Sequence, residues 1–567
     1  MRCLLAVVAK DGPLDPGLLP RGQRAAQRCV PVVRGAHRGQ QWVSPSGAGA
    51  LLTWDDEDGA GLVRQGEDAL AWSGELDGGP ADVLARLARA GTSETERALR
   101  ATGGTFALAL ARGGSDTVTV AGTAVPTVPI HLAEDDRYRY AADRASLLAL
   151  LLAAPESRPR YDLEALVPLL LAGFPTDDRT MFAGVRALPA GCAAVLSPAA
   201  TSVVELYPDG DAQDVGEVAD AVAGRLRDVV SLLPRVPAPR CTLTGGHDSR
   251  LVLAALSAAG VPATCSTAGS AGSPDVTVAA GLARLVGLPH EVEPLLPLPV
   301  LGGEVVVDVL ARACGTVLLG EGVLSAYENV GLPAGGWDPA PVLGGHGGEV
   351  LRGGFATYTS DHSPAGVRKY LRRQFFTGTS LVREQARTGY SHALAARAAA
   401  AAESPEPARV LEELYRTARA GRWTAAARGA YRHTQRLDTP LLDNLLTQAV
   451  ARAPFADRAS GRLGDEVLRR LAPDLLDVPY ADGSGAPDWR GTPSPDLRDA
   501  WREQVLDGAR SSLFDVVDRA AAEELLGPGG RPQVAWRLYT VSVLLADAWL
   551  DWLPPSRVVV AASATAA

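Results

Sequence analysis

The second half of the sequence alternates short apolar segments with long helical ones, and this alternation constrains the fold more than any other feature. The segments are, in order, a helix at Val218–Leu232, a strand at Arg240–Leu243, a helix at Leu251–Ala259, a strand at Ala263–Thr267 and a helix at Val276–Val286. Strands and helices that alternate in this way are typical of a parallel sheet covered by helices. Beyond Pro364 the pattern is almost entirely helical, so we expect a helical region to follow the α/β part.

The N-terminal part has a different pattern, in which glycine and aspartate break short apolar or alternating runs. The predicted strands are Leu4–Ala9, Ala69–Trp72, Thr105–Ala111, Thr117–Ala121 and Tyr138–Ala141. Leucines at helical spacing predict helices at Pro80–Ala90 and Asp162–Leu171. The runs Val185–Pro189 and Ala193–Leu196 suggest a closing hairpin.

The length and a change in composition predict the domain organisation. A chain of 567 residues exceeds what one hydrophobic core usually organises. Around Tyr207–Gly216 the sequence shifts to Pro, Asp and Gly, which is typical of a linker. We therefore predict two domains, residues 1–208 and residues 209–567.

The composition excludes several classes of function. A net charge of −10 disfavours broad binding of nucleic-acid phosphates. Apolar runs such as Ala145–Ala154 are too short to cross a bilayer, and Met1–Ala9 is predicted to be a strand rather than a signal peptide. The six cysteines are scattered, without paired spacing, so we expect no zinc site or disulfide framework and a cytoplasmic location.

The loop between the predicted strand Arg240–Leu243 and the predicted helix Leu251–Ala259 has the composition of a phosphate-binding site. It reads Thr-Gly-Gly-His-Asp-Ser, and its glycines let backbone N–H groups turn toward an anion at the positive end of the following helix. We predict that ATP and pyrophosphate are bound by Thr244, Gly245, Gly246, Asp248 and Ser249. Asp248 is acidic where phosphate alone would not favour an acid, so Mg²⁺ bridging this carboxylate to pyrophosphate is the simplest explanation. The alternative is a bare turn in which Asp248 and Ser249 cap the helix.

This loop resembles the S-G-G-x-D-S loop of the ATP pyrophosphatases, and other motifs resemble the asparagine synthetase family. Those motifs are Gly184-Val-Arg-Ala-Leu-Pro-Ala-Gly191, Ser273-Pro-Asp275, the Gly-rich stretch Leu343–Phe355 and Thr439-Pro-Leu-Leu-Asp443. The resemblance implies a mixed α/β and α+β two-domain fold. Stacked β-sheets with helices, as in the N-terminal-nucleophile hydrolases, would precede a parallel-sheet α/β ATP-pyrophosphatase domain that ends in a helical region. It also implies ATP and Mg²⁺ as cofactors, and it adds Gly345 to the residues that bind pyrophosphate.

The N-terminal half resembles the family's glutamine amidotransferase domain, in which an amino-terminal cysteine hydrolyses glutamine. That chemistry requires a free α-amine beside the thiol, but Cys3 follows Arg2, a residue too large to favour removal of the initiator methionine. Trp72-Ser-Gly-Glu75 stands where Asn-Gly-Glu is expected, and Gly103 stands where an acid precedes Gly104-Thr-Phe-Ala107. We therefore predict an inactive, structural domain, as in the β-lactam synthetase and lasso-peptide cyclase branches, which this chain resembles.

The Gly-rich stretch departs from asparagine synthetase at two positions, both predicted to be catalytic. His346 occupies the place of a catalytic Glu, and Glu349 occupies the place of a metal-binding Asp. In the β-lactam synthetases a tyrosine manages the amine, so the residue that handles the proton varies with the acceptor. We predict that His346 deprotonates the attacking amine, at an ordinary imidazole pKa, and that Glu349 joins Asp248 in binding Mg²⁺. The alternative for His346 is a loop histidine without a role.

Three further positions bear on this chemistry. Arg250 replaces the second serine of the family's D-S-S, with no predicted consequence. The family's C-terminal loop carries a lysine, but Asp477–Gly485 has none, and Arg490 is a candidate replacement. Glu384 is a candidate carboxylate to orient His346.

Together these residues predict an ATP-dependent, AMP-forming carbon–nitrogen ligase that couples a carboxylate to an amine. We expect it to act in specialised metabolism, for example in lasso-peptide or β-lactam-type cyclisation. One alternative is asparagine synthetase-type amidation with ammonia, and another is a non-catalytic family member that acts as a binding partner. The expected partners are a carboxylate- and amine-bearing substrate, a peptide being one candidate, and other biosynthetic proteins; neither nucleic acid nor a membrane is expected.

Overall fold

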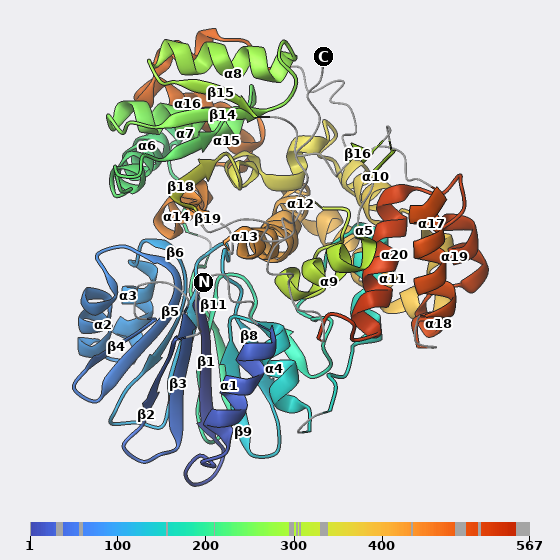
Figure 1. The fold of residues 1–567 in the computed structure, drawn as a ribbon. Coiled ribbons are helices and arrows are strands. Elements are labelled where there is room, and N and C mark those ends of the chain that lie inside the picture. The colour runs from blue at the N-terminus through green and yellow to red at the C-terminus, as the bar shows by residue number, and fades with distance from the viewer. Residues whose placement is uncertain are drawn as a thin grey trace.

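The structure is a computed structural model. It describes residues 2–29, 38–55, 61–154, 157–208, 210–293, 300–301, 304–305, 308–328, 338–432, 435–481, 495–508 and 512–550. Figure 1 shows three regions: β-sheets at the N-terminal end (blue), a smaller sheet with helices beside it (green), and a helical region (yellow to red). None of the described helices has both the length and the apolar character needed to cross a membrane.

The described N-terminal residues form two antiparallel six-stranded sheets, with the orders β10-β8-β9-β1-β3-β2 and β12-β11-β7-β6-β5-β4. The strands are β1 Arg2–Ala9, β2 Arg38–Val43, β3 Gly49–Asp55, β4 Leu62–Gln65, β5 Asp68–Leu76, β6 Gly104–Ala111, β7 Val118–Gly122, β8 His131–Glu134, β9 Tyr138–Ala142, β10 Val185–Ala187, β11 Cys192–Leu196 and β12 Thr201–Glu205. The predicted strands are confirmed. The predicted closing hairpin is wrong, because β10 pairs with β8 in the first sheet whereas β11 pairs with β7 and β12 in the second.

The two sheets stack face to face, and helices cover their outer faces. Alternate residues of a strand point to opposite faces of its sheet. On β1, the side chains in the core between the sheets are Leu4, Ala6 and Val8. Those in the core beneath helices α1 (Leu18–Cys29) and α4 (Ala145–Leu152) are Cys3, Leu5 and Val7. Helices α2 (Pro80–Arg89) and α3 (Thr92–Arg100) cover the second sheet. This four-layer arrangement confirms the predicted stacked-sheet fold.

The third sheet is parallel throughout, with the order β15-β14-β13-β18-β19. Its strands are β13 Arg240–Thr242, β14 Thr264–Ala268, β15 His290–Glu293, β18 Asp338–Gly344 and β19 Gln435–Leu437. The helices whose apolar residues share its core include α6 Val215–Ser231, α7 His247–Ala258, α8 Pro274–Leu285 and α16 Arg462–Leu471. The predicted α/β alternation is therefore confirmed. The chain adds β14 and β15 on one side of β13, and β18 and β19 on the other.

The remaining described chain is mostly helical, as predicted. Its helices are α5 Leu166–Ala172, α9 Val309–Gly320, α10 Pro364–Phe375, α11 Glu384–Glu403, α12 Arg409–Leu414, the π-helix η5 Tyr415–Thr424, α13 Ala425–Tyr431, α14 Asn444–Ala451, α15 Phe455–Ala459, α17 Pro495–Arg502, α18 Leu513–Val516, α19 Arg519–Leu525 and α20 Pro532–Leu545. Although α5 comes from the N-terminal half of the chain, it packs against α10, α11 and α20 in one shared core. The two parts of the chain are thus joined by a common hydrophobic core.

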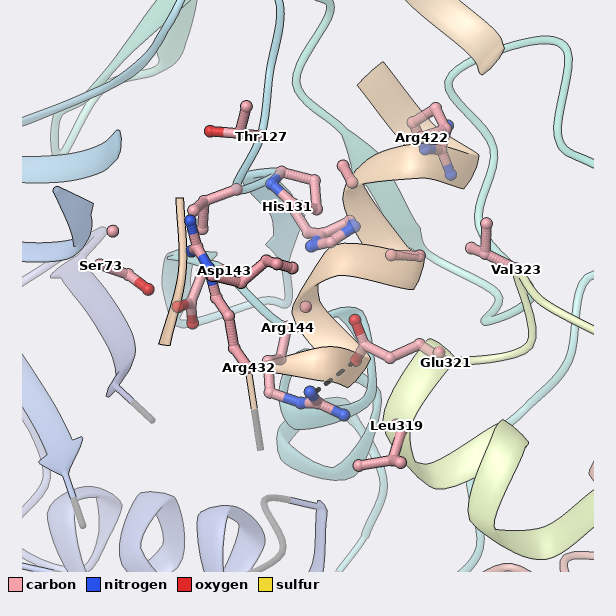
Figure 2. A pocket seen from close by; sticks show the side chains of 18 of the residues that line it. Ser73, Thr127, His131, Asp143, Arg144, Leu319, Glu321, Val323, Arg422 and Arg432 are labelled. Carbon is pink, nitrogen blue, oxygen red and sulfur yellow. Dashed lines mark ion pairs between the residues drawn. The ribbon is translucent and has the colours of Figure 1, made fainter. Parts of the chain in front are cut away.

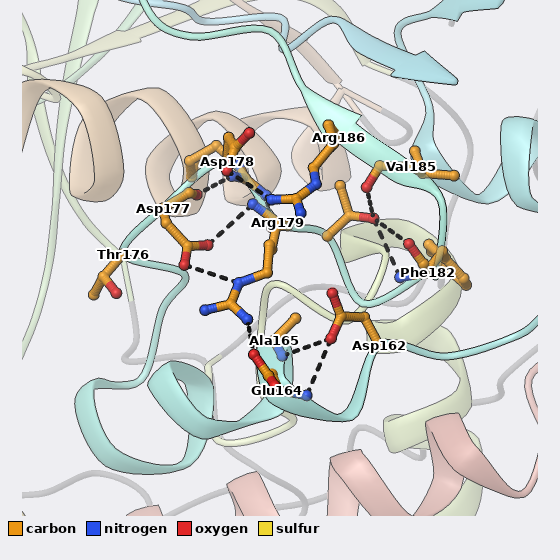
Figure 3. Close-up of polar contacts among 12 residues, drawn as sticks. Asp162, Glu164, Ala165, Thr176, Asp177, Asp178, Arg179, Phe182, Val185 and Arg186 are labelled. Carbon is orange, nitrogen blue, oxygen red and sulfur yellow. Dashed lines mark hydrogen bonds and ion pairs between the residues drawn. The ribbon is translucent and has the colours of Figure 1, made fainter. Parts of the chain in front are cut away.

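Polar contacts hold the segment that follows α5 in place (Figure 3). Arg179 donates from Nε to Asp177 at 3.0 Å and also pairs with Glu164. The guanidinium of Arg422, on η5, donates to the carbonyl oxygens of Asp177 and Arg179, at 2.6 and 3.0 Å. These contacts attach the segment to η5, which contributes residues to both cavities described below.

Candidate functional site

Two loops meet where the strand order of the parallel sheet reverses. One follows the carboxyl end of β13, and the other follows the carboxyl end of its neighbour β18. Ligands of open α/β sheets bind at such reversal points. A Cβ added at Gly345 would lie 2.3 Å from the backbone nitrogen of Ser249, so the close approach of the two loops requires glycine at this position.

Hydrogen bonds within the first loop fix its shape. The N–H of Thr244 donates to Oγ of Ser249 at 3.0 Å, and the two hydroxyls also lie 3.0 Å apart. The N–H of Gly245 donates to Oδ1 of Asp275, in the predicted Ser-Pro-Asp motif, at 2.6 Å. Gly245 therefore shapes the loop with an N–H that is already bonded to a carboxylate.

The first turn of α7 lacks a side-chain cap. Its N-cap residue, Gly246, has no side chain to accept the first N–H groups, and Asp248 and Ser249 do not cap it. The alternative in which these two residues cap the helix is therefore not formed. An uncapped helix N-terminus presents N–H groups and a partial positive charge, which is the arrangement that binds phosphate.

Asp248 is held by a guanidinium that the sequence analysis did not single out. Its two carboxylate oxygens accept from Nε and Nη2 of Arg352, at 2.9 and 2.8 Å. A Cβ at Gly348 would lie 2.2 Å from Cγ of Asp248, so the backbone also packs against this carboxylate. Burial raises the pKa of Asp248, and Arg352 counteracts that rise. In the sequence, Arg352 shows only as a basic residue within the Gly-rich stretch.

Glu349 and His346 both line the cavity beside this loop. The hydroxyl of Tyr358 donates to Oε1 of Glu349 at 3.3 Å. Solvent reaches the His346 side chain, but the surrounding protein desolvates its imidazole and lowers the pKa from 6.5 to about 4, with a further contribution from Arg428. The expectation of an ordinary imidazole pKa is therefore wrong. Glu384 does not line the cavity, so it does not orient His346 in this structure.

Arg250 has a structural role for which the sequence predicted no consequence. Its side chain is completely buried, and it donates to the carbonyl oxygens of Leu475, Val478 and Pro479 at 2.8, 2.6 and 3.2 Å. Its guanidinium also stacks on the ring of Tyr480, which in turn stacks on His247 of the phosphate loop. Arg250 thus holds residues 475–481 against this loop. Arg490, the candidate replacement for the family lysine, lies outside the described residues.

The loops open into a cavity of about 1080 Å³, here called the synthetase cavity. Its polar lining includes Thr244, Gly246, His247, Asp248, Ser249, Glu328, Gly345, His346, Glu349, Arg352, Arg373, Arg419 and Arg537. Its aromatic lining includes Phe174, Phe355, Tyr358, Tyr370, Tyr415 and Trp423. A cavity of this size accommodates a ligand larger than a nucleotide alone.

The carboxylates that line the synthetase cavity suit a metal ion that binds together with phosphate. Among the residues that the structure describes, no cluster of three or more His, Cys, Asp or Glu side chains is arranged to hold a metal. Asp248 and Glu349, from α7 and the 3₁₀ helix Gly348–Arg352, nevertheless line one cavity. Mg²⁺ in nucleotide sites usually takes one or two carboxylates and completes its shell with phosphate and water. These two carboxylates fit that role if Arg352 gives up part of its hold on Asp248.

Cys3 is enclosed within the N-terminal sheets. Its side chain is completely buried, and its backbone nitrogen lies within β1, in a peptide bond to Arg2. Burial raises the pKa of its thiol well above 9, and the nearby Asp143 carboxylate adds to that rise. Such a thiol is a poor nucleophile.

A second cavity, of about 260 Å³, lies between the N-terminal sheets and a wall that includes residues of α9, η5, α13 and β19 (Figure 2). We call it the interdomain cavity. Ser73, Gly74 and Glu75, which stand where the family's glutamine-holding motif is expected, line it. Across it, Nε of Arg144 lies 3.7 Å from Oε1 of Glu321.

Gly103, where the family has an acid, packs against an ion pair. A Cβ at this position would lie 2.3 Å from Nη2 of Arg225 and 2.4 Å from Oδ2 of Asp77. Arg225 pairs with Asp77 and also with Asp443, of the predicted Thr-Pro-Leu-Leu-Asp motif, which accepts the N–H of Gly104 at 2.7 Å. A glycine at position 103 therefore leaves room for a salt bridge that joins the two halves of the chain.

Comparison with known proteins extends these observations. A protein-family model described as Asparagine synthase matches residues 217–551. No curated protein matches the chain. Similar solved structures include glutamine phosphoribosylpyrophosphate amidotransferase from B. subtilis complexed with ADP and GMP, at 10% identity and a TM-score of 0.26, covering 51% of this chain and 65% of that one. They also include a structure described as the allosteric regulatory enzyme of purine biosynthesis, at 11% identity and a TM-score of 0.26, covering 66% and 79%. This chain thus spans slightly less than two thirds of the first of these proteins.

Proposed function

This chain belongs to the asparagine synthase family of ATP-dependent, amide-bond-forming ligases, and we propose that it works by adenylation. A substrate carboxylate attacks the α-phosphorus of ATP and releases pyrophosphate. An amine then attacks the acyl carbon and displaces AMP. The protein's task is to align the reacting groups and to stabilise the charge of the departing groups.

The observation that carries the proposal is the uncapped N-terminus of α7 in the wall of the synthetase cavity. Its first-turn N–H groups suit the β- and γ-phosphates of ATP. The hydroxyls of Thr244 and Ser249 lie in the same wall, and Gly345 allows the loop after β18 to pack closely against the phosphate loop. The clamp that Arg250 makes on residues 475–481 supports this assignment, because it holds the loop in one shape.

Asp248 and Glu349 would hold Mg²⁺, which neutralises phosphate charge when it is bound. Because Asp248 is paired with Arg352 in this structure, we propose that Arg352 moves toward the phosphates as the nucleotide enters. A guanidinium suits that role because its fork matches two phosphate oxygens. Arg352 then supplies the positive charge that a lysine supplies in other family members.

The second step requires the amine to lose a proton. We propose that His346 accepts it or holds the amine by a hydrogen bond. With a pKa of about 4 the imidazole is neutral throughout the cytoplasmic range. It is therefore always available as an acceptor, although it is a weak base.

Glutamine is not the nitrogen source in this proposal, since the Cys3 thiol is buried and its α-nitrogen is in a peptide bond. The size of the synthetase cavity favours a substrate larger than aspartate and ammonia. We propose a peptide or similar molecule that carries both the carboxylate and the amine, joined in a cyclisation of the lasso-peptide or β-lactam type in specialised metabolism. The enzyme would act in the cytoplasm with other biosynthetic proteins.

The test is the identity of the nucleotide products. A panel of carboxylates, including aspartate and short peptides with Asp or Glu side chains, is incubated with ATP, Mg²⁺ and labelled pyrophosphate. We expect label to enter ATP only with an accepted carboxylate, and AMP to form only when an amine is also present. ADP as the product contradicts adenylation. Asparagine formed from aspartate and ammonia contradicts the proposed substrate class.

A further inference from the structure

One wall of the synthetase cavity consists of groups that can only donate hydrogen bonds. Arg419 and Trp423 come from the π-helix η5, and Arg537 comes from α20. Guanidinium and indole groups have N–H donors and no acceptor. A π-helix is rare and is often found at functional sites. We call these three residues the donor wall.

Two buried donors of this wall lack hydrogen-bond partners within the part of the chain that the structure describes. Arg537 is only 8% exposed, and neither its buried Nε nor the Nε1 of Trp423 has a hydrogen-bond partner there. Arg419 stacks on Trp423, with 3.4 Å between its guanidinium carbon and the ring centroid, and otherwise contacts the ring of Phe174. An N–H group buried without an acceptor is costly, so such a group is normally satisfied by a partner.

The charge of the wall is only partly balanced by protein. The carboxylate of Glu328 acts electrostatically on both arginines, but its Oε2 already accepts the N–H of Ser325 at 3.0 Å. Glu328 forms no ion pair with either arginine among the described residues. Burial lowers the pKa of both guanidinium groups, which reflects the cost of holding them charged away from water. By contrast, Arg352 in the same cavity is fully paired with Asp248.

Close packing fixes the position of Arg537. Gly173, at the C-terminal end of α5, has a φ of 88°, and a Cβ there would lie 2.3 Å from Nη2 of Arg537. The guanidinium thus lies directly against the backbone at Gly173, whose positive φ favours glycine. The wall is therefore built before any ligand arrives.

We propose that Arg419, Trp423 and Arg537 form a binding subsite for a carboxylate of the acyl substrate. A donor-only wall suits an anion and rejects an ammonium group, so it belongs to the carboxylate side of the reaction rather than to the amine. Arg419 also interacts electrostatically with Glu349, which places the subsite close to the proposed adenylation centre. The inference rests on the proposed function for the source of the carboxylate, since an anion subsite could also hold a phosphate of ATP.

Two calorimetric titrations test the subsite. In the first, succinate is titrated into the full-length protein at constant ionic strength, with chloride as the balancing anion. In the second, the probe is Mg²⁺ with a non-hydrolysable ATP analogue. Arg537→Gln and Arg419→Gln should each weaken succinate binding about tenfold or more, and Trp423→Phe about fivefold. Arg372→Gln, on an exposed residue of α10 outside this cavity, should leave it unchanged.

The outcomes separate this inference from the proposed function. Wild-type affinity for succinate in both arginine variants, or no succinate binding to the wild type, overturns the subsite. Loss of nucleotide affinity in these variants, with succinate binding intact, assigns the wall to phosphate and also overturns it. Failure of the wild type to bind the nucleotide contradicts the proposed function alone. Arg537→Lys serves as a control that keeps the charge. Circular dichroism establishes that each variant is folded. If Arg537→Gln does not fold, the test rests on Arg419→Gln, because Arg419 is only half-buried.

Discussion

The interdomain cavity and the synthetase cavity both contain buried arginines, but the two differ in what those arginines contact. In the interdomain cavity Arg144 lies against Glu321 and donates to the carbonyl oxygen of Leu318 at 2.5 Å (Figure 2). In the synthetase cavity, Nε of Arg537 and Nε1 of Trp423 have no hydrogen-bond partner among the described residues, and the guanidinium of Arg419 lies against two aromatic rings. The first cavity is therefore balanced largely by the protein itself, whereas the second is left incomplete.

The remaining unpartnered groups sharpen this difference. In the interdomain cavity, Oγ1 of Thr127, Nδ1 of His131 and Nε of Arg144 also lack hydrogen-bond partners, although Nε of Arg144 lies 3.7 Å from the Glu321 carboxylate. A hydroxyl and a neutral imidazole can each donate or accept, so water satisfies them. The groups of the donor wall, by contrast, can only donate, and two of them are charged. We propose that the interdomain cavity is a structural junction and that catalysis belongs to the synthetase cavity, a division that the following experiments test.

The largest effect is expected for Asp248→Asn. The amide keeps the shape of the carboxylate but loses its charge, and it leaves Arg352 without its partner. We expect pyrophosphate exchange to fall by roughly 10³-fold, as for other groups that stabilise charge in the transition state. Exchange is measured with labelled pyrophosphate over a range of Mg²⁺ concentrations. Unchanged exchange would remove Asp248 from the phosphate site and leave the synthetase cavity without its proposed metal ligand.

A smaller effect, confined to the second step, is expected for His346→Ala. The variant should still exchange pyrophosphate into ATP, but amide formation should fall by about 10²-fold, the low end for a general base, because the pKa of His346 is only about 4. For the same reason the wild-type rate should show no titration of this imidazole near pH 6.5. Rates of both half-reactions between pH 5 and 8 check this.

Two other results would change the assignment of His346. If exchange and amide formation fall together, the residue supports nucleotide binding or the loop. If neither falls, it is a loop histidine without a catalytic role. His362→Ala is a suitable control, since this histidine contacts the carbonyl oxygens of Ala356 and Thr359 and does not line the cavity.

Much of the fold, and the residues around the phosphate loop, could be predicted because they depend on local sequence. Strand, glycine loop and helix follow one another between β13 and α7, and strands such as β5 and β6 show in the apolar pattern. The stacking of the sheets was predicted from the family resemblance alone. The contacts that complete the site depend on tertiary structure. Nothing in the spacing indicates that Arg352 reaches Asp248, or that Arg250 holds residues 475–481.

The errors have the same origin. The hairpin of β10 and β11 failed because two strands that are neighbours in sequence belong to different sheets. The pKa of His346 could not be foreseen because it depends on walls contributed by distant segments. Arg537 went unnoticed because an arginine in a helical pattern usually faces solvent, whereas α20 is buried on nearly all sides.

The interdomain cavity should affect stability rather than catalysis, and two of its groups should do so with opposite pH dependence. Burial lowers the pKa of His131 from 6.5 to about 4, so its stabilising contribution is complete above pH 6.5 and is lost as the pH falls toward 4. Burial raises the pKa of Asp143 from 3.8 to about 6, so its contribution is complete below pH 3.8 and is lost as the pH rises through 6. Each shift corresponds to about 3 kcal/mol.

Between pH 4 and 6 the contributions of His131 and Asp143 to stability change with pH in opposite directions. Single substitutions should reveal each contribution. Relative to wild type, His131→Gln should lose stability as the pH rises, and Asp143→Asn should gain it. Urea unfolding across this range measures both, with His392→Gln, on an exposed residue of α11, as the control. Parallel pH profiles for all three variants would contradict the burial of charge in this cavity. Pyrophosphate exchange should be unchanged in each.

The smallest effect on catalysis is expected for Cys3→Ala, which removes the only sulfur that the glutaminase chemistry of this family would use. The thiol is completely buried and its pKa is raised, so it supplies no thiolate near neutral pH. Its side chain belongs instead to the core beneath α1 and α4. We therefore expect the variant to lose about 1 kcal/mol of stability from the buried sulfur and to keep its full rate of adenylation and amide formation. Wild type and variant should release equal, background amounts of glutamate from glutamine. Glutamate release that disappears in the variant, together with an intact mass showing a chain that starts at Cys3, would make the interdomain cavity an active site and end the division drawn between the two cavities.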